Sequence, residues 1–333
     1  MNKTIGIFGP YPPPLGGISV HIARMEPFLN QESIDYTIFN HGFVENKNVI
    51  STNKKLFWYF KMLFIKKYNT FHFHQFFLFH FIFYFIFSNF RSEKIIVTIH
   101  SERILSYSKL KRIFVLFFIR NTKRLKLISV SQNLNIYLNK QGIESVFLPA
   151  YVPPRYVEEI KIKHSKKLIL FSVWKFNEKL ANEIYNVPLA FKYLSHNKQK
   201  YKMIFMVGNK SDSDEKYLQE LIYKYQIANN IIILYNESLI NYLNNCQFLL
   251  RPNLSDGYGV SVQEALDLGV PAIASDACER PKGSVVFKNN DFEDLSSKIE
   301  FIENTPLKKI LQETEKLDYH TQLIEIYKTI INA

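Results

Sequence analysis

Residues 251–266 read Arg-Pro-Asn-Leu-Ser-Asp-Gly-Tyr-Gly-Val-Ser-Val-Gln-Glu-Ala-Leu, and the interpretation of the whole chain starts from them. The apolar run just before them, 248–250, predicts a strand, and the run that begins near Val262 predicts a helix. The first N–H groups of a helix have no intrahelical acceptor and the helix dipole is positive there, so such a loop favours a phosphate. Gly257 and Gly259 lack a Cβ atom, which lets the backbone approach a ligand closely.

Two carboxylates bracket this predicted phosphate site. Asp256 lies in the loop, and Glu264 follows eight residues later in the predicted helix. Carboxylates accept hydrogen bonds, and the hydroxyl groups of a sugar and of a ribose donate them. The structural alternative is that Asp256 is a surface acid and that Glu264 caps the helix. The spacing alone leaves both interpretations open.

On both sides of this stretch, strand-like apolar runs alternate with segments of helical length. This alternation predicts an α/β fold with parallel sheets and crossovers on both faces. The predicted strands are 4–8, 33–39, 70–74, 94–100, 125–130, 146–148, 168–173, 203–207, 231–234, 248–250 and 271–274. The predicted helices are 18–25, 76–87, 187–194, 216–225, 239–244 and 262–268, and residues 307–331 also show helical spacing.

The length of 333 residues exceeds what one hydrophobic core usually fills, so two domains are expected. Prolines at 149, 153 and 154 interrupt the alternation and suit a semi-rigid connector. We therefore expect an N-terminal domain over residues 1–150 and a C-terminal domain over residues 151–310. A C-terminal helix over residues 311–333 is expected to follow them.

Composition excludes several classes of protein. Apolar residues make up 47% and charged residues 22% of the chain, which excludes wholesale disorder. Two cysteines cannot build a disulfide framework or a four-cysteine zinc site. The first residues do not follow the pattern of a secretory signal, so a cytoplasmic location is expected. The apolar run 76–90 is shorter than the roughly 20 residues that a membrane-spanning helix needs, and it predicts a buried helix.

The net charge of +12 favours anionic partners: nucleic acid, phosphorylated small molecules or an acidic membrane surface. Basic residues cluster around two aromatic-rich runs, which suits helices that dock on anionic lipids; the alternative is an ordinary amphipathic helix with a solvated basic face. No aromatic-basic RNA motif or helix-turn-helix spacing is found, so nucleic acid is not an expected partner. The clusters are Lys54, Lys55, Lys61, Lys66 and Lys67 within 54–67, and Lys109, Lys111, Arg112, Arg120, Lys123, Arg124 and Lys126 within 109–126.

Residues 251–266 resemble the E-x7-E signature of the retaining GT-B glycosyltransferases of family 4, the group 1 transferases. Asp256 stands at the first glutamate of that pattern, and Glu264 matches the second. Other blocks resemble the family in the same order, so the resemblance extends from residue 6 to about residue 287. They are 267–275 after the signature, the N-terminal glycine loop 9–21, and the strand ends 71–74 and 97–100.

The resemblance implies an α/β fold of the GT-B type, in which two Rossmann-like domains with parallel sheets face each other across a cleft. It also implies that the C-terminal helix packs back toward the N-terminal domain. Members of the family transfer a sugar from a nucleotide-diphosphate donor to an acceptor hydroxyl, retain the anomeric configuration and need no metal or other cofactor.

By position in the family pattern, His100 and Asp256 would be the catalytic residues at the donor sugar. Glu264 would hold the ribose hydroxyls, and the remaining donor-binding positions lie in the two glycine loops. These positions are Gly16, Gly17, Gly257, Tyr258, Gly259, Val260 and Ser261.

The sequence departs from the family where an arginine and a lysine usually hold the diphosphate. After the strand 168–173, Lys175 is the best substitute for the arginine, although an ammonium group cannot make the bidentate contact of a guanidinium. Tyr185 and Asn186 replace the usual lysine-glycine pair, and Lys179 is the nearest substitute for that lysine.

The histidines differ in how strongly they suggest function. His72 and His74 share one face of a strand, but no third ligand is found nearby, so packing or lining of a cleft is favoured over metal binding. His21 is interpreted as structural. His100 has the strongest functional case, because α/β folds bind ligands at the carboxyl ends of strands.

The leading hypothesis is a retaining, metal-independent glycosyltransferase with a nucleotide-diphosphate sugar donor and a saccharide or lipid-linked acceptor. It would work in bacterial surface polysaccharide or glycolipid synthesis, on the inner face of the cell membrane. The alternative is a catalytically silent GT-B subunit that binds a nucleotide sugar or a partner transferase, as the altered Lys/Arg positions suggest.

Overall fold

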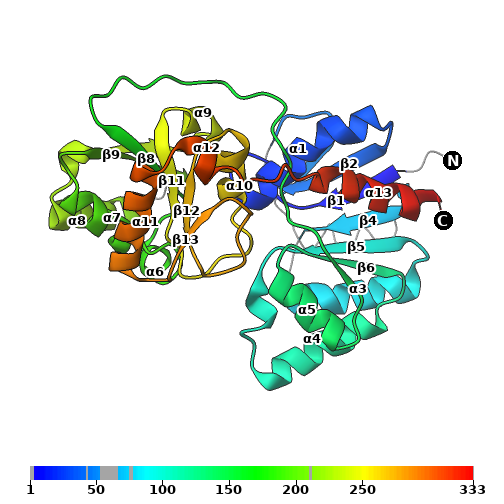
Figure 1. Ribbon diagram of the computed structural model, residues 1–333. Helices are drawn as coiled ribbons and strands as arrows, with labels where there is room; N and C mark the ends of the chain where they lie inside the picture. The colour runs from blue at the N-terminus through cyan, green and yellow to red at the C-terminus, as the bar shows by residue number, and fades with distance from the viewer. Residues whose placement is uncertain (1–3, 43, 53–66, 75–77, 210–211, 333) are drawn as a thin grey trace. The chain divides into compact units, whose positions relative to one another are not determined.

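The computed structural model describes residues 4–42, 44–52, 67–74, 78–209 and 212–332, and the chain forms two compact units. Unit 1 contains residues 1–13, 17–152 and 318–333, and unit 2 contains residues 14–16 and 153–317. Each unit is built around one parallel sheet with helices on both faces (Figure 1). The predicted α/β fold with two Rossmann-like domains is therefore confirmed.

The sheet of unit 1 has seven strands in the order β3-β2-β1-β4-β5-β6-β7, and all of its pairs are parallel. The order reverses between β1 and β4, so the loops that leave these two strands separate toward opposite faces. The strands are β1 (Thr4–Phe8), β2 (Asp35–His41), β3 (Val49–Thr52), β4 (Thr70–Phe73), β5 (Lys94–Ile99), β6 (Leu125–Ser129) and β7 (Ser145–Phe147).

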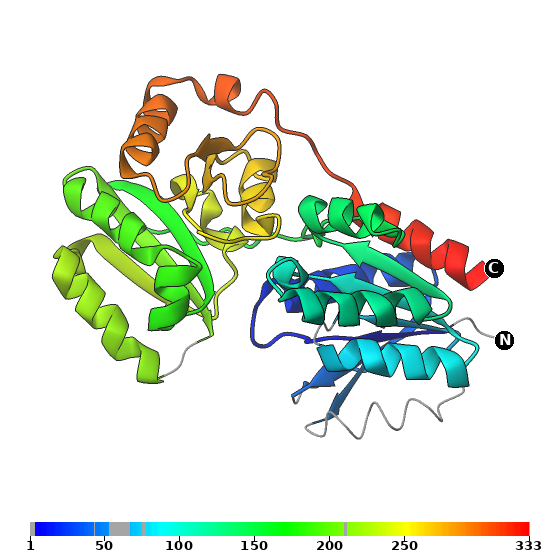
Figure 2. The same cartoon turned by 90° about the horizontal axis from the view of Figure 1, so that it is seen from below.

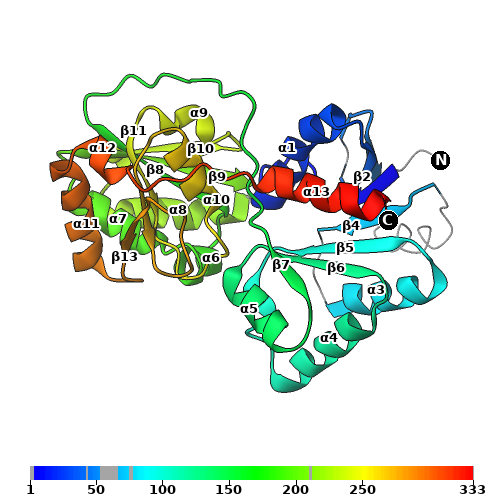
Figure 3. The same cartoon turned by 45° about the vertical axis from the view of Figure 1, so that its right-hand side comes forward.

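Alternate side chains of β1 enter two different cores. Ile5 and Ile7 pack with α1 (Gly17–Gln31) and α13 (Tyr319–Asn332) on one face of the sheet. Phe8 packs on the other face, where its ring stacks on that of Phe39 with the centroids 4.2 Å apart. That face is covered by α3 (Leu78–Phe90), α4 (Lys109–Asn121) and α5 (Gln132–Lys140), and Figure 3 shows these three helices on the side of the sheet opposite to α13. A short 3-10 helix, η1 (Glu102–Ile104), connects β5 to α4.

The sheet of unit 2 has six parallel strands in the order β10-β9-β8-β11-β12-β13, with its reversal between β8 and β11. The strands are β8 (Lys167–Lys175), β9 (Tyr201–Asn209), β10 (Ile231–Tyr235), β11 (Cys246–Arg251), β12 (Ala272–Ser275) and β13 (Val285–Phe287). The helices are α6 (Glu178–Glu183), α7 (Val187–His196), α8 (Asp212–Tyr225), η2 (Ala228–Asn230), α9 (Ile240–Leu243), α10 (Val260–Asp267), α11 (Phe292–Asn304) and α12 (Leu307–Ile310). Figure 2 shows α7 and α8 side by side, as their mutual contacts require.

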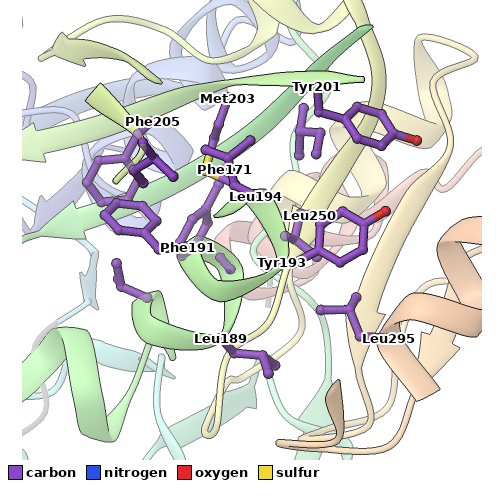
Figure 4. Packing of buried hydrophobic residues seen from close by; sticks show 14 of the residues in the cluster. Phe171, Leu189, Phe191, Tyr193, Leu194, Tyr201, Met203, Phe205, Leu250 and Leu295 are labelled. Atoms are coloured by element: carbon purple, nitrogen blue, oxygen red, sulfur yellow. The ribbon is translucent and has the colours of Figure 1, made fainter. Parts of the chain in front are cut away.

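Aromatic packing dominates the larger core of unit 2. The rings of Phe171 on β8 and Phe191 on α7 lie 5.3 Å and 5.4 Å from the ring of Phe205 on β9, all three fully buried (Figure 4). At the edge of this core the Tyr201 hydroxyl donates to Glu303, which also pairs with Lys200. The other face of the sheet packs on α9 and α10, so α10 is anchored by its apolar side.

The structure differs from the predicted elements mainly at short strands and in the tail. Residues 307–331 form two helices, α12 and α13, with 311–318 between them in non-helical conformation. The short edge strands β3 and β13 were not predicted, whereas the short edge strand β7 was. Helices α5, α6 and α11 were also missed, although Asp291 caps α11 by accepting hydrogen bonds from the amides of Glu293 and Asp294. No helix in the described part of the chain is long and apolar enough to cross a membrane.

The aromatic core of unit 2 leads to a prediction about stability. Phe205→Ala removes a fully buried ring and should lower the free energy of unfolding by about 3–5 kcal/mol, because the lost burial is followed by a cavity. Urea unfolding of unit 2, followed by circular dichroism, measures this change. Tyr223→Ala on α8, where the side chain is 86% exposed, is the matched control and should change the value by less than about 0.5 kcal/mol. Equal losses in both variants would contradict the assigned core.

Candidate active site

The loop between β11 and α10 lies at the carboxyl edge of the unit 2 sheet, beside the point where the strand order reverses. Open α/β sheets bind ligands at such reversals, because the neighbouring loops separate and leave the strand ends accessible. Gly259 is the residue before α10 and has φ of 83°, a left-handed conformation that favours glycine. A Cβ atom there would also come within 2.8 Å of Arg280 Nη1, so this position requires glycine for two reasons.

Asp256 is held inside this loop by two guanidinium groups. Arg251 Nη2 donates to Asp256 Oδ1 at 2.8 Å, and Arg280 Nη1 donates to Oδ2 at 2.7 Å. The amide of Gly257 donates to Oδ1 at 3.0 Å. Burial alone would raise the pKa of the Asp256 carboxyl, but the two arginines outweigh burial and hold that pKa far below its ordinary value. Asp256 is therefore an ionised, internally bonded carboxylate, and the catalytic role implied by the resemblance stays a prediction.

The same two arginines fix the surrounding backbone. Arg251 Nη1 donates to Ser261 Oγ at 3.0 Å in the first turn of α10. Arg280 Nε donates to the Ser275 carbonyl at 2.7 Å at the end of β12. Two guanidinium groups and one carboxylate leave one net positive charge next to the N-terminus of α10. That charge and the helix dipole have the same sign, and both favour an anion in front of Val260 and Ser261.

Glu264 lies in the second turn of α10 and is only 4% exposed. Its neighbour Gln263 fixes the helix from the other side: Gln263 Nε2 donates to Asp267 Oδ1 at 2.8 Å and to the Glu315 carbonyl at 3.1 Å. The hydroxyl of Tyr258 donates to Gln263 Oε1 at 3.2 Å, which ties the loop to the helix. The predicted donor-binding positions from 256 to 264 are thus brought together in one short, strongly bonded segment.

The two predicted substitutes for the missing cations lie in different environments. Lys175 ends β8, the strand next to β11, and its position is compatible with the site. Lys179 lies on α6 with its side chain 78% exposed, 3.9 Å from Glu183 in an ion pair on the helix surface. Of the glycines in the N-terminal loop, Gly16 ends the segment 14–16 of unit 2, and Gly17 begins α1 in unit 1.

Two residues that hold the loop were given no role in the sequence analysis. Arg251 comes directly after the apolar residues of a strand. A basic residue at the end of a strand could have indicated an anion-binding position. Arg280 lies 24 residues beyond Asp256, and no local pattern connects them. Tyr185, which replaces part of the family's lysine-glycine pair, also belongs to this environment: burial raises the pKa of its phenol, while Arg251 and the backbone of Lys175 lower it.

In unit 1, His100 directly follows β5, and His72 and His74 belong to β4 and its carboxyl end. His74 Nδ1 lies 2.9 Å from His100 Nε2, and the ring of His21 on α1 lies 5.4 Å from that of His74. Burial lowers the pKa of His100 to about 3 and that of His21 to about 4, so both rings are neutral at physiological pH. Among the described residues, no group of three or more His, Cys, Asp or Glu side chains is arranged to hold a metal ion.

Comparison with known proteins connects unit 2 to a described family. Residues 156–318 match the family model of the glycosyl transferases group 1, and this range covers nearly all of unit 2. Protein CapJ of Staphylococcus aureus is 30% identical over 102 residues, which is 29% of this chain. The match spans about a fifth of the length of that curated relative, 22%.

Solved structures resemble the chain over nearly its whole length at low sequence identity. Sucrose-phosphate synthase of Thermosynechococcus elongatus has a TM-score of 0.77 at 12% identity, over 99% of both chains. HepE of Anabaena, solved in complex with UDP-glucose, has a TM-score of 0.71 at 11% identity, over 98% of this chain and 99% of that one. WaaG, a glycosyltransferase involved in lipopolysaccharide biosynthesis, has a TM-score of 0.71 at 12% identity, over 99% and 100% of the two chains.

These likenesses agree with the two parallel sheets and with the loop that leads into α10. The chain has the GT-B fold, and its residues 156–318 belong to the glycosyl transferases group 1 family.

Proposed function

We propose that this protein is a retaining, metal-independent glycosyltransferase that moves a sugar from a nucleotide-diphosphate donor to a saccharide or lipid-linked acceptor. The observation that carries the proposal is the cationic loop at the start of α10. There, Arg251 and Arg280 leave one positive charge beside the first amides of α10, in the segment that matches the family model. The complex of HepE with UDP-glucose supports the class of donor.

The chemistry of the leaving group fits this loop. When the bond between the anomeric carbon and the phosphate breaks, negative charge develops on the oxygens of a nucleoside diphosphate. Preorganised N–H groups and guanidinium groups stabilise that charge without reorganising during the reaction. In this proposal the amides of Val260 and Ser261 and the two arginines do so in place of a metal ion. Retention would follow from attack on the face that the departing phosphate leaves, so no protein nucleophile is assigned.

Asp256 and Glu264 have different roles in this proposal. Asp256 keeps both arginines in place and its low pKa keeps it ionised, so that its charge does not change across the physiological range. Glu264, buried in the second turn of α10, would accept hydrogen bonds from the ribose hydroxyls. The diphosphate would then lie between them, at the first turn of the helix.

An acceptor at a membrane is supported by the surface of α4. Leu110, Ile113 and Phe117 are exposed at helical spacing on one face, while Val115 and Leu116 face the core. Lys109 and Lys111 are exposed beside that apolar face. Next to α4, the C-terminal residue of α3, Phe90, is 79% exposed. Such a face suits the headgroup region of an anionic bilayer, as a cytoplasmic peripheral enzyme of polysaccharide or glycolipid synthesis would need.

The rest of the predicted basic surface contributes less. Arg124 donates to the carbonyl of Ser88, and Lys126 pairs with Glu144 at 2.7 Å, so both are used within unit 1. Residues 54–66 of the other basic cluster lie outside the described residues. Lys67 is exposed.

A catalytically silent GT-B subunit is the second candidate. It is favoured by Lys179, whose ammonium is exposed and pairs with Glu183 instead of turning toward the loop. Such a protein would bind a nucleotide sugar without transferring it. A panel of nucleotide sugars, with nucleotide release followed in the presence of lipid-linked acceptors, separates the two candidates: turnover supports the enzyme, and binding without turnover supports the silent subunit.

For the donor site, Glu264→Ala should raise the dissociation constant of the best nucleotide sugar about tenfold or more, because hydrogen bonds to a carboxylate contribute roughly 1.5–3 kcal/mol. Isothermal titration calorimetry measures it. Glu220→Ala on α8, an exposed acid of the same unit, is the control and should leave the constant unchanged. Unchanged affinity in Glu264→Ala, with the fold intact by circular dichroism, would refute the ribose role.

For the membrane surface, a triple variant with Leu110→Asp, Ile113→Asp and Phe117→Asp should reduce sedimentation with phosphatidylglycerol vesicles at least about tenfold, since each residue loses apolar burial of roughly 1.5–3 kcal/mol. Tyr223→Asp, equally exposed but on unit 2, should sediment like the parent. A parent protein that does not sediment with these vesicles, or a triple variant that sediments as well as the parent, would contradict membrane docking by α4.

A further inference from the structure

Four histidine rings meet at the carboxyl edge of the unit 1 sheet, and they come from three different elements and their ends. His72 lies on β4, His74 just after it, His100 just after β5, and His21 on α1. The centroids of His72 and His74 are 4.0 Å apart, those of His74 and His100 are 5.2 Å apart, and His21 lies 6.0 Å from His100. His21, His72 and His74 are buried, and His100 keeps partial exposure.

His72 uses both of its ring nitrogens within the protein. Its Nδ1 lies 2.5 Å from the hydroxyl of Tyr327 on α13, and its Nε2 lies 2.7 Å from Thr98 Oγ1 on β5. Both ring nitrogens therefore already have hydrogen-bond partners, so His72 has none left for a ligand or for His74. Its ring contacts His74 only by packing. The ring of His72 forms the fixed wall against which His74 lies.

The contact between His74 and His100 is of a different kind, because it joins two imidazoles. Nδ1 of His74 and Nε2 of His100 are 2.9 Å apart, a hydrogen-bond distance. Two nitrogen lone pairs would repel at this distance, so one of the two atoms carries the proton and the other accepts it. Burial lowers the pKa of both rings, and the neighbouring histidines lower the pKa of each further, so both rings are neutral and one N–H lies in the contact between them.

We propose that His74 is the positioning residue of His100: it occupies His100 Nε2, locks His100 in one tautomer, and leaves His100 Nδ1 as the nitrogen that meets a sugar hydroxyl of the substrate. The inference rests on the proposed function for the identity of that hydroxyl. The hydrogen bond between the two rings is a property of the protein without ligand.

A buried nitrogen near this pair supports a polar ligand at the same edge. His21 Nδ1 is buried and has no hydrogen-bond partner among the residues that the structure describes. A buried nitrogen without a hydrogen bond is unfavourable, and a hydroxyl group or a water molecule next to it would remove that cost. The neighbouring charge is Arg24 on the same helix, which further disfavours protonation of His21.

Substitution of His74 by asparagine or glutamine tests the proposal, because the side-chain amide of each residue can replace one nitrogen of the imidazole ring. The amide of asparagine lies about where Nδ1 of histidine lies, and that of glutamine about where Nε2 lies. His74→Asn therefore keeps a partner for His100 Nε2, whereas His74→Gln and His74→Ala do not. Tyr327→Phe is the matched control, since it removes a hydrogen bond from the neighbouring ring of His72 and leaves the contact between His74 and His100 intact.

The first measurement is the ¹⁵N spectrum of the histidine side chains in the ligand-free protein, with His100 assigned from the signal lost in His100→Gln. The parent, His74→Asn and Tyr327→Phe should show one protonated and one unprotonated nitrogen for His100. His74→Gln and His74→Ala should show averaged shifts, as expected of a mixture of tautomers. Averaged shifts in the parent, or unchanged shifts in His74→Ala, would overturn the proposal.

The second measurement is turnover. His74→Gln and His74→Ala should lower kcat about 10- to 100-fold with donor KM within about twofold, while His74→Asn stays within about threefold of the parent. Tyr327→Phe should keep the parent kcat. Equal losses in His74→Asn and His74→Gln would overturn the positioning role. If the parent shows no turnover with any donor, the proposed function fails, and the spectra of the free protein still decide whether His74 locks His100.

Discussion

The parallel pairing of β8 with β11 is the constraint on which the candidate site depends. These strands are distant in sequence and adjacent in the sheet, and the strand order reverses between them. Their carboxyl ends therefore lie at the same edge of the sheet, where β11 ends at Arg251 and β8 continues beyond its paired residues to Lys175. The loop that follows β11 has to turn at once into α10, and Gly259, in a left-handed conformation, allows that turn. A cation and a helix N-terminus are brought together by topology alone.

The charge arrangement in this loop explains how a buried acid can serve an anion site. An ionised Asp256 by itself would repel a phosphate, and a buried carboxylate without partners would be costly by several kcal/mol. Arg251 and Arg280 overcome both problems. Their guanidinium groups neutralise the carboxylate of Asp256, and one net positive charge is left at the start of α10. Removing either arginine would thus leave a buried charge poorly compensated, at about 3–5 kcal/mol, and would weaken the field that favours the phosphate. In the proposed function, stability and donor binding would depend on the same three side chains.

Much of the fold could be predicted because buried parallel strands read as continuous apolar runs, such as 94–99 and 168–173. The short edge strands β3 and β13 carried no such signal, and the tail 307–331 kept a helical spacing across a segment, 311–318, that is not helical. In the site, the contiguous positions 256–264 could be found from the sequence. Arg280 could not, since its contact with Asp256 is made across 24 residues by the return of the chain through β12. Contacts set by tertiary structure leave no local pattern.

The C-terminal helix also contacts the histidine cluster of unit 1. Residues 318–333 belong to unit 1, where α13 packs beside α1 and contributes the Tyr327 hydroxyl to His72. His72 in turn supports the ring of His74, and His74 bonds to His100. In the sequence, neither His72 nor His74 could be distinguished from a packing residue. The difference between them depends on which groups their ring nitrogens contact in the folded protein. For His72 both contacts are structural, whereas for His74 the partner is the residue with the strongest functional case. The last helix thus holds His72, while the carboxyl ends of β4 and β5 place His74 and His100 next to each other.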